Sequence, residues 1–357
     1  HKTKLMKRSI VKTVLGTLLS LSCFVLLSAC SSKTKKEKQA QTAAVYPSEV
    51  LPFMDQWKIL LGDGTYKDSL LNYAKKDYFY VENEAQTNWV VYKTPNAGIS
   101  SKNSHNTRTE LGQIKEWTPE EGGKLNGTLK VQHVSTSGNA RVAASYSVVV
   151  GQIHSHQGHE NEPLKIFYKK FPGHEKGSVF WNYEINMEGS NSGRWDYSTA
   201  VWGYDMSVLG ASPDSYPKEP EDGIALGEEF SYEVNVFEGI MYLTFTSDGH
   251  PTKRFTKNLL KSEFAKKEDM PQQIKTLYAA IGRDGVEREN AYAGELQFFK
   301  QGAYNQTNGK NPKDNIVWST GSDVYGGDIE QQYANGSYTE VWFSAGSLGP
   351  GTKPEVE

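Results

Sequence analysis

Residues 230–246, FSYEVNVFEGIMYLTFT, indicate the fold class because they read as two short strands joined by a tight turn. Phe230–Val236 and Met241–Thr246 are rich in aromatic and β-branched residues, which favour extended backbone. Between them, Phe237-Glu238-Gly239-Ile240 has the length and the glycine of a hairpin connection. The stretch therefore predicts an antiparallel hairpin in a β-rich protein.

The same pattern continues through most of the chain after Tyr78. Short runs rich in Val, Tyr, Phe and Trp alternate with clusters of Gly, Asn, Asp and Pro, which is typical of strands and turns. Many short strands without a fixed-period repeat favour an all-β fold, a β-jelly-roll sandwich of two antiparallel sheets with a concave substrate groove. Helical character is expected only at 51–74 and 259–267. The further predicted strands are 88–92, 124–131, 143–153, 164–171, 179–185, 277–281 and 294–299.

The first thirty residues read as a bacterial secretion signal. A basic start at Met6-Lys7-Arg8 precedes an apolar run over 11–27, and small residues end the run. Such a segment is removed on export and does not span the membrane in the mature protein. Its last residues, Leu27-Ser28-Ala29-Cys30, resemble a lipobox, in which Cys30 is lipidated and becomes the new N-terminus. We therefore expect a secreted or outer-membrane, cell-surface lipoprotein of a bacterium, with an ordinary cleaved signal as the alternative.

The rest of the chain is predicted to form one folded body. A flexible tether over 31–47 precedes a jelly-roll domain over 48–345, and a disordered tail over 346–357 follows. The Pro-rich stretch 211–223 is expected to be a long loop that forms a wall or lid over a cleft. Both cysteines, at 23 and 30, lie in the signal segment, so the body has no thiol for a disulfide, a nucleophile or a metal.

Charge limits the choice of partners. The formal net charge is −3, but residues 1–40 carry nine Lys or Arg and one acidic residue. The remainder has 30 basic and 41 acidic residues, a formal charge of about −11. This balance argues against nucleic acid as a partner, and any anionic substrate must be held by a local basic cluster.

Three segments carry chemistry. The first is Arg108-Thr109-Glu110-Leu111, in which alternation along a strand puts Arg108 and Glu110 on the same face. The second is Gln152-Ile153-His154, which has the same spacing, and the third is 298–306, FFKQGAYNQ, which presents Tyr304 after a glycine. Taken singly, each has an ordinary explanation: a surface ion pair, a polar strand face and a packed tyrosine.

Together, the three segments resemble the signature motifs of the alginate lyases of polysaccharide lyase families 7 and 18. Those families share Arg-(Ser/Thr)-Glu-Leu, Gln-(Ile/Val)-His and Tyr-Phe-Lys-x-Gly-x-Tyr-Asn-Gln, and all three occur here in the family order. The resemblance spans about residues 50–343, and 151–204 looks closer to family 18. Two positions depart from it. Gly112 stands where family 7 often has a second Arg, which removes one substrate-binding cation, and Phe298 replaces the first Tyr of the third motif.

The resemblance implies β-elimination on alginate, with no cofactor and no metal. Arg108 and Gln152 would neutralise the uronate carboxylate beside the C5 proton. His154, with a reference pKa of about 6.5, would donate to the carboxyl or act as the base. Tyr304 would lend a proton to the leaving oxygen. The substrate-binding residues expected around this catalytic set are Glu110, Lys165, Lys300, Asn305 and Gln306.

The stereochemistry of the substrate divides the labour. In mannuronate the C5 proton and the C4 oxygen lie on the same side, so Tyr304 alone can serve as base and acid. In guluronate they lie on opposite sides, which suits His154 as base and Tyr304 as acid. In the family, an Ile between Gln and His, here Ile153, accompanies acceptance of guluronate-containing substrate.

Three other functions compete with this interpretation. His154, His156, His159 and Glu160 have the spacing of a zinc site, although His154 already has a role that needs no metal. A non-catalytic carbohydrate-binding jelly-roll module would keep the groove, but it would not need the complete catalytic set. A glycoside hydrolase would need two carboxylates flanking the bond, and Glu110 is the one acid in the motifs. We expect a monomer that acts on alginate.

Overall fold

The computed structural model describes residues 43–101, 104, 106–156, 161–186, 196–262, 288–308 and 328–355. By its contacts, the chain divides into residues 1–40 and a compact unit over 41–357. The signal segment, Cys30 and most of the predicted tether lie outside the described residues, as do the predicted strand at 277–281 and most of 259–267. Among the described residues, no helix is both long and apolar enough to cross a membrane.

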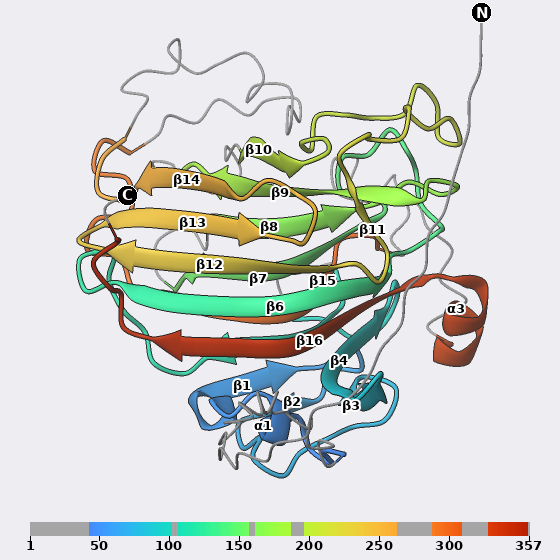
Figure 1. Cartoon of the computed structure of the whole chain (residues 1–357), viewed down its shortest axis with the longest axis horizontal. Helices are drawn as coiled ribbons and strands as arrows, with labels where there is room; N and C mark the ends of the chain where they lie inside the picture. The colour runs from blue at the N-terminus through green and yellow to red at the C-terminus, as the bar shows by residue number, and fades with distance from the viewer. Residues whose placement is uncertain are drawn as a thin grey trace, which may run out of the picture. The chain divides into compact units, whose positions relative to one another are not determined.

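The described residues form two antiparallel sheets, as the sequence predicts (Figure 1). The first sheet has nine strands in the order β10-β9-β8-β7-β15-β5-β1-β2, with β11 paired to β9. Neighbours in this order are far apart in sequence, so the sheet gathers segments from across the chain. Its strands are β1 (Trp57–Leu60), β2 (Tyr66–Lys67), β5 (Arg108–Gln113), β7 (Ser147–Ser155), β8 (Leu164–Lys169), β9 (Lys176–Glu184), β10 (Asp196–Trp202), β11 (Ile224–Ala225) and β15 (Gln297–Asn305).

The second sheet has seven strands in the order β14-β13-β12-β6-β16-β4-β3. Its β12 and β13 are the predicted hairpin, paired from Ser231–Thr246 to Phe237–Ile240. Glu238 and Gly239 form the turn with φ of 50° and 78°, the backbone that this hairpin type requires. Its strands are β3 (Phe79–Glu84), β4 (Thr87–Pro95), β6 (Gly123–His133), β12 (Glu229–Phe237), β13 (Ile240–Thr246), β14 (Lys253–Asn258) and β16 (Tyr338–Gly349).

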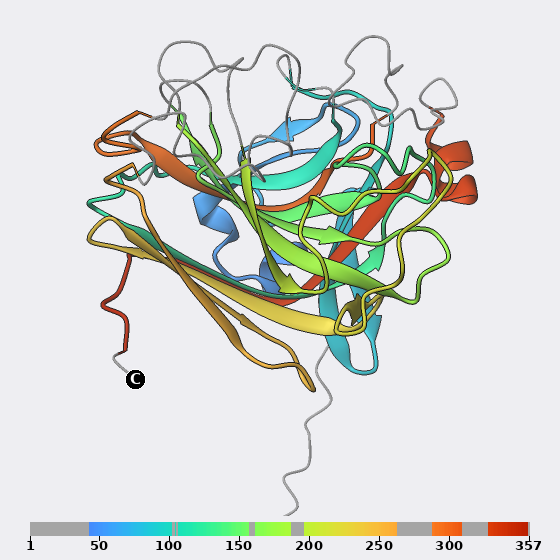
Figure 2. The same cartoon turned by 90° about the horizontal axis from the view of Figure 1, so that it is seen from above.

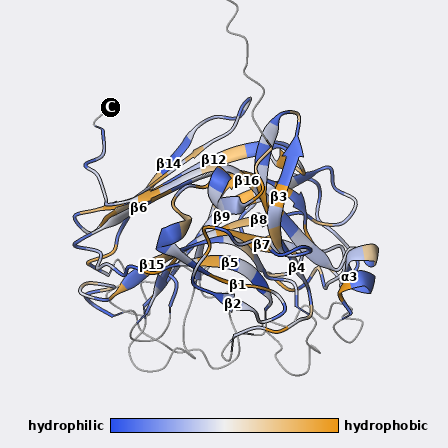
Figure 3. Cartoon of the chain, turned by 90° about the horizontal axis from the view of Figure 1, so that it is seen from below, coloured by the Kyte–Doolittle hydropathy of each residue, from blue (hydrophilic) through white to orange (hydrophobic). Residues whose placement is uncertain are grey.

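The core lies between the two sheets, which Figure 2 shows as two layers. Side chains alternate along strands such as β1, in which Trp57 and Ile59 are buried. Lys58 and Leu60 of the same strand are partly exposed. Large aromatic side chains from both sheets, including Tyr232 and Phe343, join one continuous hydrophobic cluster. Figure 3 shows hydrophobic residues on strands of both layers. Burial of this apolar surface, at about 25 cal/mol per Å², stabilises the sandwich without disulfides.

One expectation about secondary structure is wrong. Residues 51–74 are not helical beyond short turns: only α1 (Pro47–Val50) and the 3-10 turn Met54–Gln56 precede β1. Among the described residues, a further helix that was not predicted is α3 (Ile329–Asn335), with Asp328 as its N-cap and Gly336, at φ 83°, after its end. The helix predicted at 259–267 lies mostly outside the described residues, and of its first residues 259–261 form bends.

The predicted disordered tail at 346–357 also begins too early. β16 continues to Gly349 and pairs with β6 over that length. Beyond it, the Asn235 amide donates to the Thr352 carbonyl at 2.7 Å and accepts from the Thr352 N–H at 2.9 Å. These bonds fix the chain end against β12 because they satisfy backbone groups that a free tail would leave to water.

Candidate active site

The three motifs meet on one face of the nine-stranded sheet, because β15 lies between β5 and β7. In β15, Tyr304 pairs with Arg108 of β5, and Lys300 pairs with Gln152 of β7. Phe298, two residues before Lys300, pairs with His154. Since alternate residues of a strand share a face, one set of side chains from each motif emerges on the side of the sheet away from the core.

A glycine in β15 makes this packing feasible. Gly302 has φ 143°, and a Cβ there would lie 2.6 Å from the Thr109 carbonyl oxygen and 2.8 Å from the Tyr92 ring. The register of β15 against β7 shifts between Gln301 and Tyr304, which marks a bulge. Bulges re-aim side chains beside functional sites, and here the bulge lies directly before Tyr304.

Tyr304 and Arg108 are stacked. The Arg108 guanidinium carbon lies 3.8 Å from the centre of the Tyr304 ring. Ser104 joins the pair: its hydroxyl accepts from Arg108 Nη2 at 3.1 Å and lies 3.2 Å from the Tyr304 hydroxyl. Burial opposes the charge of Arg108, but Tyr304 and Glu110 outweigh it and raise the pKa of Arg108. A permanently charged guanidinium therefore holds the tyrosine ring in place and lies close to its hydroxyl.

Glu110 is the common acceptor of the site. It accepts from Arg108 Nη1 at 3.1 Å, from Lys300 Nζ at 3.4 Å and from the Gln152 amide nitrogen. Its side chain is only 1% exposed. Because its oxygens already accept from three donors and its charge has the same sign as that of a uronate, Glu110 does not bind a uronate carboxylate, which corrects its prediction as a substrate-binding residue. Glu110 instead orients three donors, which is how a preorganised anion site is supported.

His154 is held as a neutral base. Its Nδ1 lies 2.7 Å from the Ser155 carbonyl oxygen. Because a carbonyl can only accept, Nδ1 carries the proton of the neutral ring and Nε2 keeps its lone pair. Burial lowers the pKa of His154 to about 4, Lys300 adds to the effect, and Glu162 opposes it. The ring stacks on Phe298 with centroids 5.1 Å apart, which fixes its plane.

Lys165 reaches the same face but is not available as a substrate cation. Its Nζ lies 3.1 Å from Glu162 and 3.3 Å from Glu184, and its side chain is 7% exposed. A lysine enclosed by two carboxylates cannot offer its charge to a polyanion without breaking a buried pair, which is costly. The prediction of direct substrate binding by Lys165 is therefore corrected to a role in holding Glu162.

Asn305 points away from the site. It follows Tyr304 on the strand, so alternation turns it to the opposite face, where it is fully buried. Its amide donates to Asn96 at 2.8 Å and accepts from the Thr307 N–H at 3.0 Å. Its prediction as a substrate-binding residue is wrong. Gln306 is also buried, and its amide donates to the Tyr304 carbonyl at 3.4 Å, so it supports the strand end.

The sequence interpretation missed two residues that contact the motif side chains, Ser104 and Glu162, and a third, Lys58, that lies on a neighbouring strand. Ser104 lies four positions before Arg108, within reach of its side chain. Glu162 precedes β8 and approaches His154, with 3.6 Å between Nε2 and Oε1. Lys58 lies in β1, opposite Gly112. The apolar residues Trp57 and Ile59 on either side of Lys58 indicate that its side chain points away from the core. The strand that pairs with β1 could not be deduced from the sequence.

The zinc alternative finds no support among the described residues, which contain no group of three or more His, Cys, Asp or Glu able to hold a metal. His156 is exposed, and its Nδ1 contacts Glu116. His159 and Glu160 lie outside the described residues.

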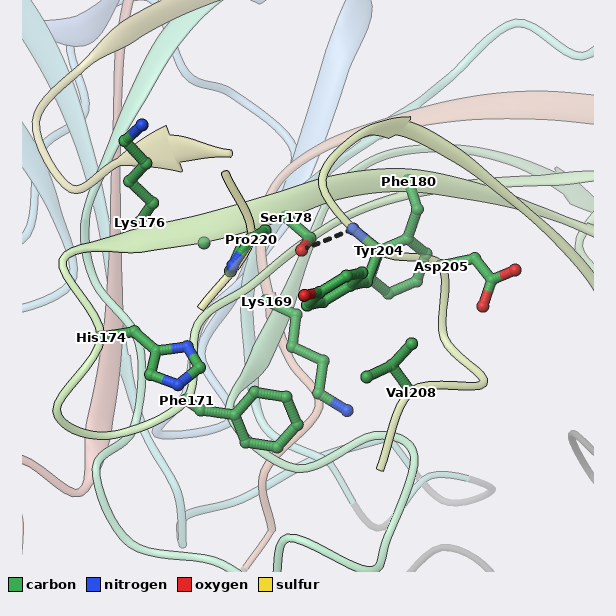
Figure 4. A pocket seen from close by; sticks show the side chains of 11 residues that line it. Lys169, Phe171, His174, Lys176, Ser178, Phe180, Tyr204, Asp205, Val208 and Pro220 are labelled. Atoms are coloured by element: carbon green, nitrogen blue, oxygen red, sulfur yellow. Dashed lines mark hydrogen bonds between the residues drawn. The ribbon is translucent and has the colours of Figure 1, made fainter. Parts of the chain in front are cut away.

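Hollows elsewhere on the described surface do not share this chemistry. A hollow of about 750 Å³ on the seven-stranded sheet is lined mainly by residues of β12–β14 and by 352–355, and it includes none of the motif residues. The hollow of Figure 4 lies beside Lys169, Phe171 and Tyr204, but its cavity volume of about 10 Å³ has room for little more than one water. Neither hollow is lined by His154, by Tyr304 or by the donors around Glu110.

The motif site, in contrast, can carry out acid–base chemistry on an anion. Arg108, Lys300 and the Gln152 amide are donors for a carboxylate, His154 supplies a lone pair and Tyr304 supplies a hydroxyl. Neutralising a carboxylate makes the proton on the adjacent carbon easier to remove, because the negative charge that develops there is stabilised.

Comparison with known proteins agrees with this chemistry. A family model described as alginate lyase matches residues 51–349. An alginate lyase of Klebsiella pneumoniae is 28% identical over 279 residues, which cover 68% of this chain and 76% of that protein.

Similar solved structures have the same fold. The exolytic PL7 alginate lyase AlyA5 from Zobellia galactanivorans is 77% identical, with a TM-score of 0.86, and covers 87% of this chain and 100% of that chain. The alginate lyase structure from Klebsiella pneumoniae has a TM-score of 0.60 at 21% identity, covering 87% of this chain and 100% of that chain, a likeness of fold. The predicted jelly roll and the resemblance to family 7 are thus confirmed, while the leaning toward family 18 stays a prediction.

Proposed function

Because this chain belongs to the alginate lyase family, we propose that it cleaves alginate exolytically, with His154 and Tyr304 as the proton-transfer pair. The prediction of a polysaccharide lyase is confirmed by the family, and the non-catalytic binding module is not supported. The observation that supports the residue roles is the meeting of base, acid and carboxylate donors on one sheet face.

In the proposed reaction, the uronate carboxylate lies against the donors Arg108, Lys300 and Gln152. On guluronate, His154 Nε2 takes the C5 proton, the C5–H electron pair forms the C4–C5 double bond, and the C4–O bond breaks. Tyr304 gives its hydroxyl proton to the leaving oxygen. Transfer of the imidazolium proton back to the phenolate, directly or through water, restores both groups, so one bond is eliminated without oxidant or cofactor.

The exolytic mode rests on the likeness to the Zobellia enzyme, which is described as exolytic and is 77% identical. An exolytic enzyme releases small unsaturated products from chain ends, so the viscosity of an alginate solution falls slowly relative to product formation. The test follows viscosity and product size together from the first minutes of reaction. A rapid loss of viscosity with intermediate oligomers accumulating first would establish endolytic cleavage instead.

We further propose that guluronate-containing chains are accepted, as Ile153 between Gln152 and His154 suggests through the family resemblance. The neutral His154 base supports this choice, because guluronate needs base and acid on opposite sides. Initial rates on separate polyguluronate and polymannuronate blocks, followed by the ultraviolet absorbance of the unsaturated product, test it. Turnover of mannuronate blocks alone would contradict it.

We also propose that the protein is exported by a bacterium and anchored through a lipid on Cys30, and that it acts as a monomer. The basic start, apolar run and lipobox-like end of residues 1–30 support this proposal. Metabolic labelling with a fatty acid in a bacterial host, for the parent chain and for Cys30→Ala, tests the anchor. Equal labelling of both chains would refute it.

A further inference from the structure

A lysine outside the three motifs lies across a gap in one of them. Lys58 of β1 pairs with Gly112 of β5. A Cβ built on Gly112 would lie 3.6 Å from Lys58 Cε and 3.8 Å from Lys58 Cγ, which is ordinary contact. The Lys58 side chain thus covers the position that the glycine leaves without a side chain.

The alternation along β1 points the Lys58 side chain to the sheet face that carries the motif residues. Trp57 and Ile59, on either side, are buried in the core between the sheets, while Lys58 is partly exposed. Alternation therefore places Lys58 on the same face as Arg108 and Glu110. Within the part of the chain that the structure describes, no carboxylate lies within ion-pair distance of Lys58 Nζ.

Strand pairing puts Lys58 in a row with the active site. Lys58 pairs with Gly112, Gly112 with Lys300, and Lys300 with Gln152. Lys58 and Lys300 are thus two strands apart, about 10 Å across the sheet. The row runs perpendicular to the strands, so a chain lying across the strands over Lys300 would also pass Lys58.

The charges around the catalytic set balance one another, so a polyanionic substrate requires a further cation such as Lys58. The carboxylates that enclose the three cations of the site leave those six side chains with no net charge, although the substrate is a polyanion. Lys58 supplies the surplus positive charge. The six are Arg108, Lys165 and Lys300 with Glu110, Glu162 and Glu184.

We propose that Lys58 forms a carboxylate-binding subsite, which holds the uronate next along the chain from the sugar under attack. This inference rests on the proposed function, because it takes the ligand to be a polyuronate. A partly exposed ammonium contributes binding energy without touching the reacting atoms, so its effect falls on KM and not on kcat.

The experiment measures kcat and KM on alginate across a range of NaCl concentrations for the parent enzyme, Lys58→Gln and Lys253→Gln. Lys253 lies in edge strand β14 of the other sheet, so its variant removes the same global charge far from the groove. We expect Lys58→Gln to raise KM about threefold to fivefold at low salt, with kcat within about twofold. KM should also rise less steeply with salt than in the parent. Lys253→Gln should have the same kcat, the same KM and the same dependence of KM on salt as the parent.

A second variant tests the position itself. In Lys58→Gln/Gly112→Lys, the new side chain starts one strand nearer the catalytic set, in space that the lysine occupied. We expect its KM to return toward the parent value. The inference is overturned if Lys58→Gln leaves KM unchanged, or if Lys253→Gln raises KM equally. In either case unsaturated product still forms, so the failure would be distinct from failure of the lyase assignment.

Discussion

Nε2 of His154 lies 3.6 Å from Oε1 of Glu162, so the proposed base faces a carboxylate. Lys165 holds that carboxylate through its other oxygen, at 3.1 Å. Resting His154 is neutral, because burial and Lys300 lower its pKa. Once it has taken a proton, the imidazolium gains a partner in Glu162. The acid therefore offsets part of the cost of charging a buried ring, at the moment when the reaction requires it.

Glu162→Gln should lower kcat by about tenfold. The pKa of His154, already about 4, should fall further, because Glu162 is the main group that opposes burial. The acid limb of the profile of kcat/KM against pH should then move to lower pH. KM should stay level or fall, since the variant removes a negative charge from a groove for a polyanion.

The His154 pKa can be measured without activity, by NMR titration of the histidine ring signals in both proteins. Glu162→Asp keeps the charge and should retain more turnover than Glu162→Gln. An unchanged His154 pKa, or an unchanged kcat in Glu162→Gln, would show that the carboxylate does not assist the base.

Tyr304→Phe should keep the fold and substrate binding but lose most turnover. Its ring stacks on Arg108, and phenylalanine preserves that contact while removing the hydroxyl. The loss of a positioned acid costs about 10²–10⁴-fold in kcat. Single-turnover rates and the thermal unfolding midpoint together check this prediction. A kcat near that of the parent would mean that another group protonates the leaving oxygen.

Chelation should leave turnover intact. The groups available to neutralise the substrate carboxylate are Arg108, Lys300 and Gln152, and these need no ion. Dialysis against a strong chelator, followed by rate measurements with and without added zinc, provides the test. Loss of activity that zinc alone restores would point back to the histidines at 154, 156 and 159.

The face that the proposed catalytic residues share could be predicted from the sequence because residues two apart in a strand lie on one face, while their roles follow from the family resemblance. Arg108 with Glu110, and Gln152 with His154, share a face through local alternation alone. The same rule should have excluded Asn305, which directly follows Tyr304. Lys58 and Glu162 could not be placed, because their partners depend on which strands pair and in what register. The burial of Glu110 and Lys165 likewise depends on neighbours from other strands, so their supporting roles became visible only in the structure.

Lys169 gives a prediction about stability. This residue of β8 is 4% exposed, and its ammonium donates to the Ala143 carbonyl at 2.8 Å and lies 4.8 Å from the centre of the Phe171 ring. Burial lowers its pKa to about 7, from 10.5 in an exposed lysine. Between these two pH values the unfolded chain binds more protons than the folded protein, so stability increases with pH across that window. Below about pH 7 both states are charged, and the folded protein bears the whole cost.

Lys169→Met should remove this dependence. Relative to the parent, the variant should gain about 5 °C more in Tm at pH 6 than at pH 9.5. The lost bond to Ala143 costs the same at both pH values, so it cancels in the difference. Lys253→Met, at a partly exposed position of β14, serves as the control and should show the same change in Tm at both pH values. Thermal unfolding of the three proteins at the two pH values decides the matter. Equal changes in Tm for Lys169→Met at pH 6 and pH 9.5 would mean that Lys169 keeps its charge throughout, paired or hydrated in solution.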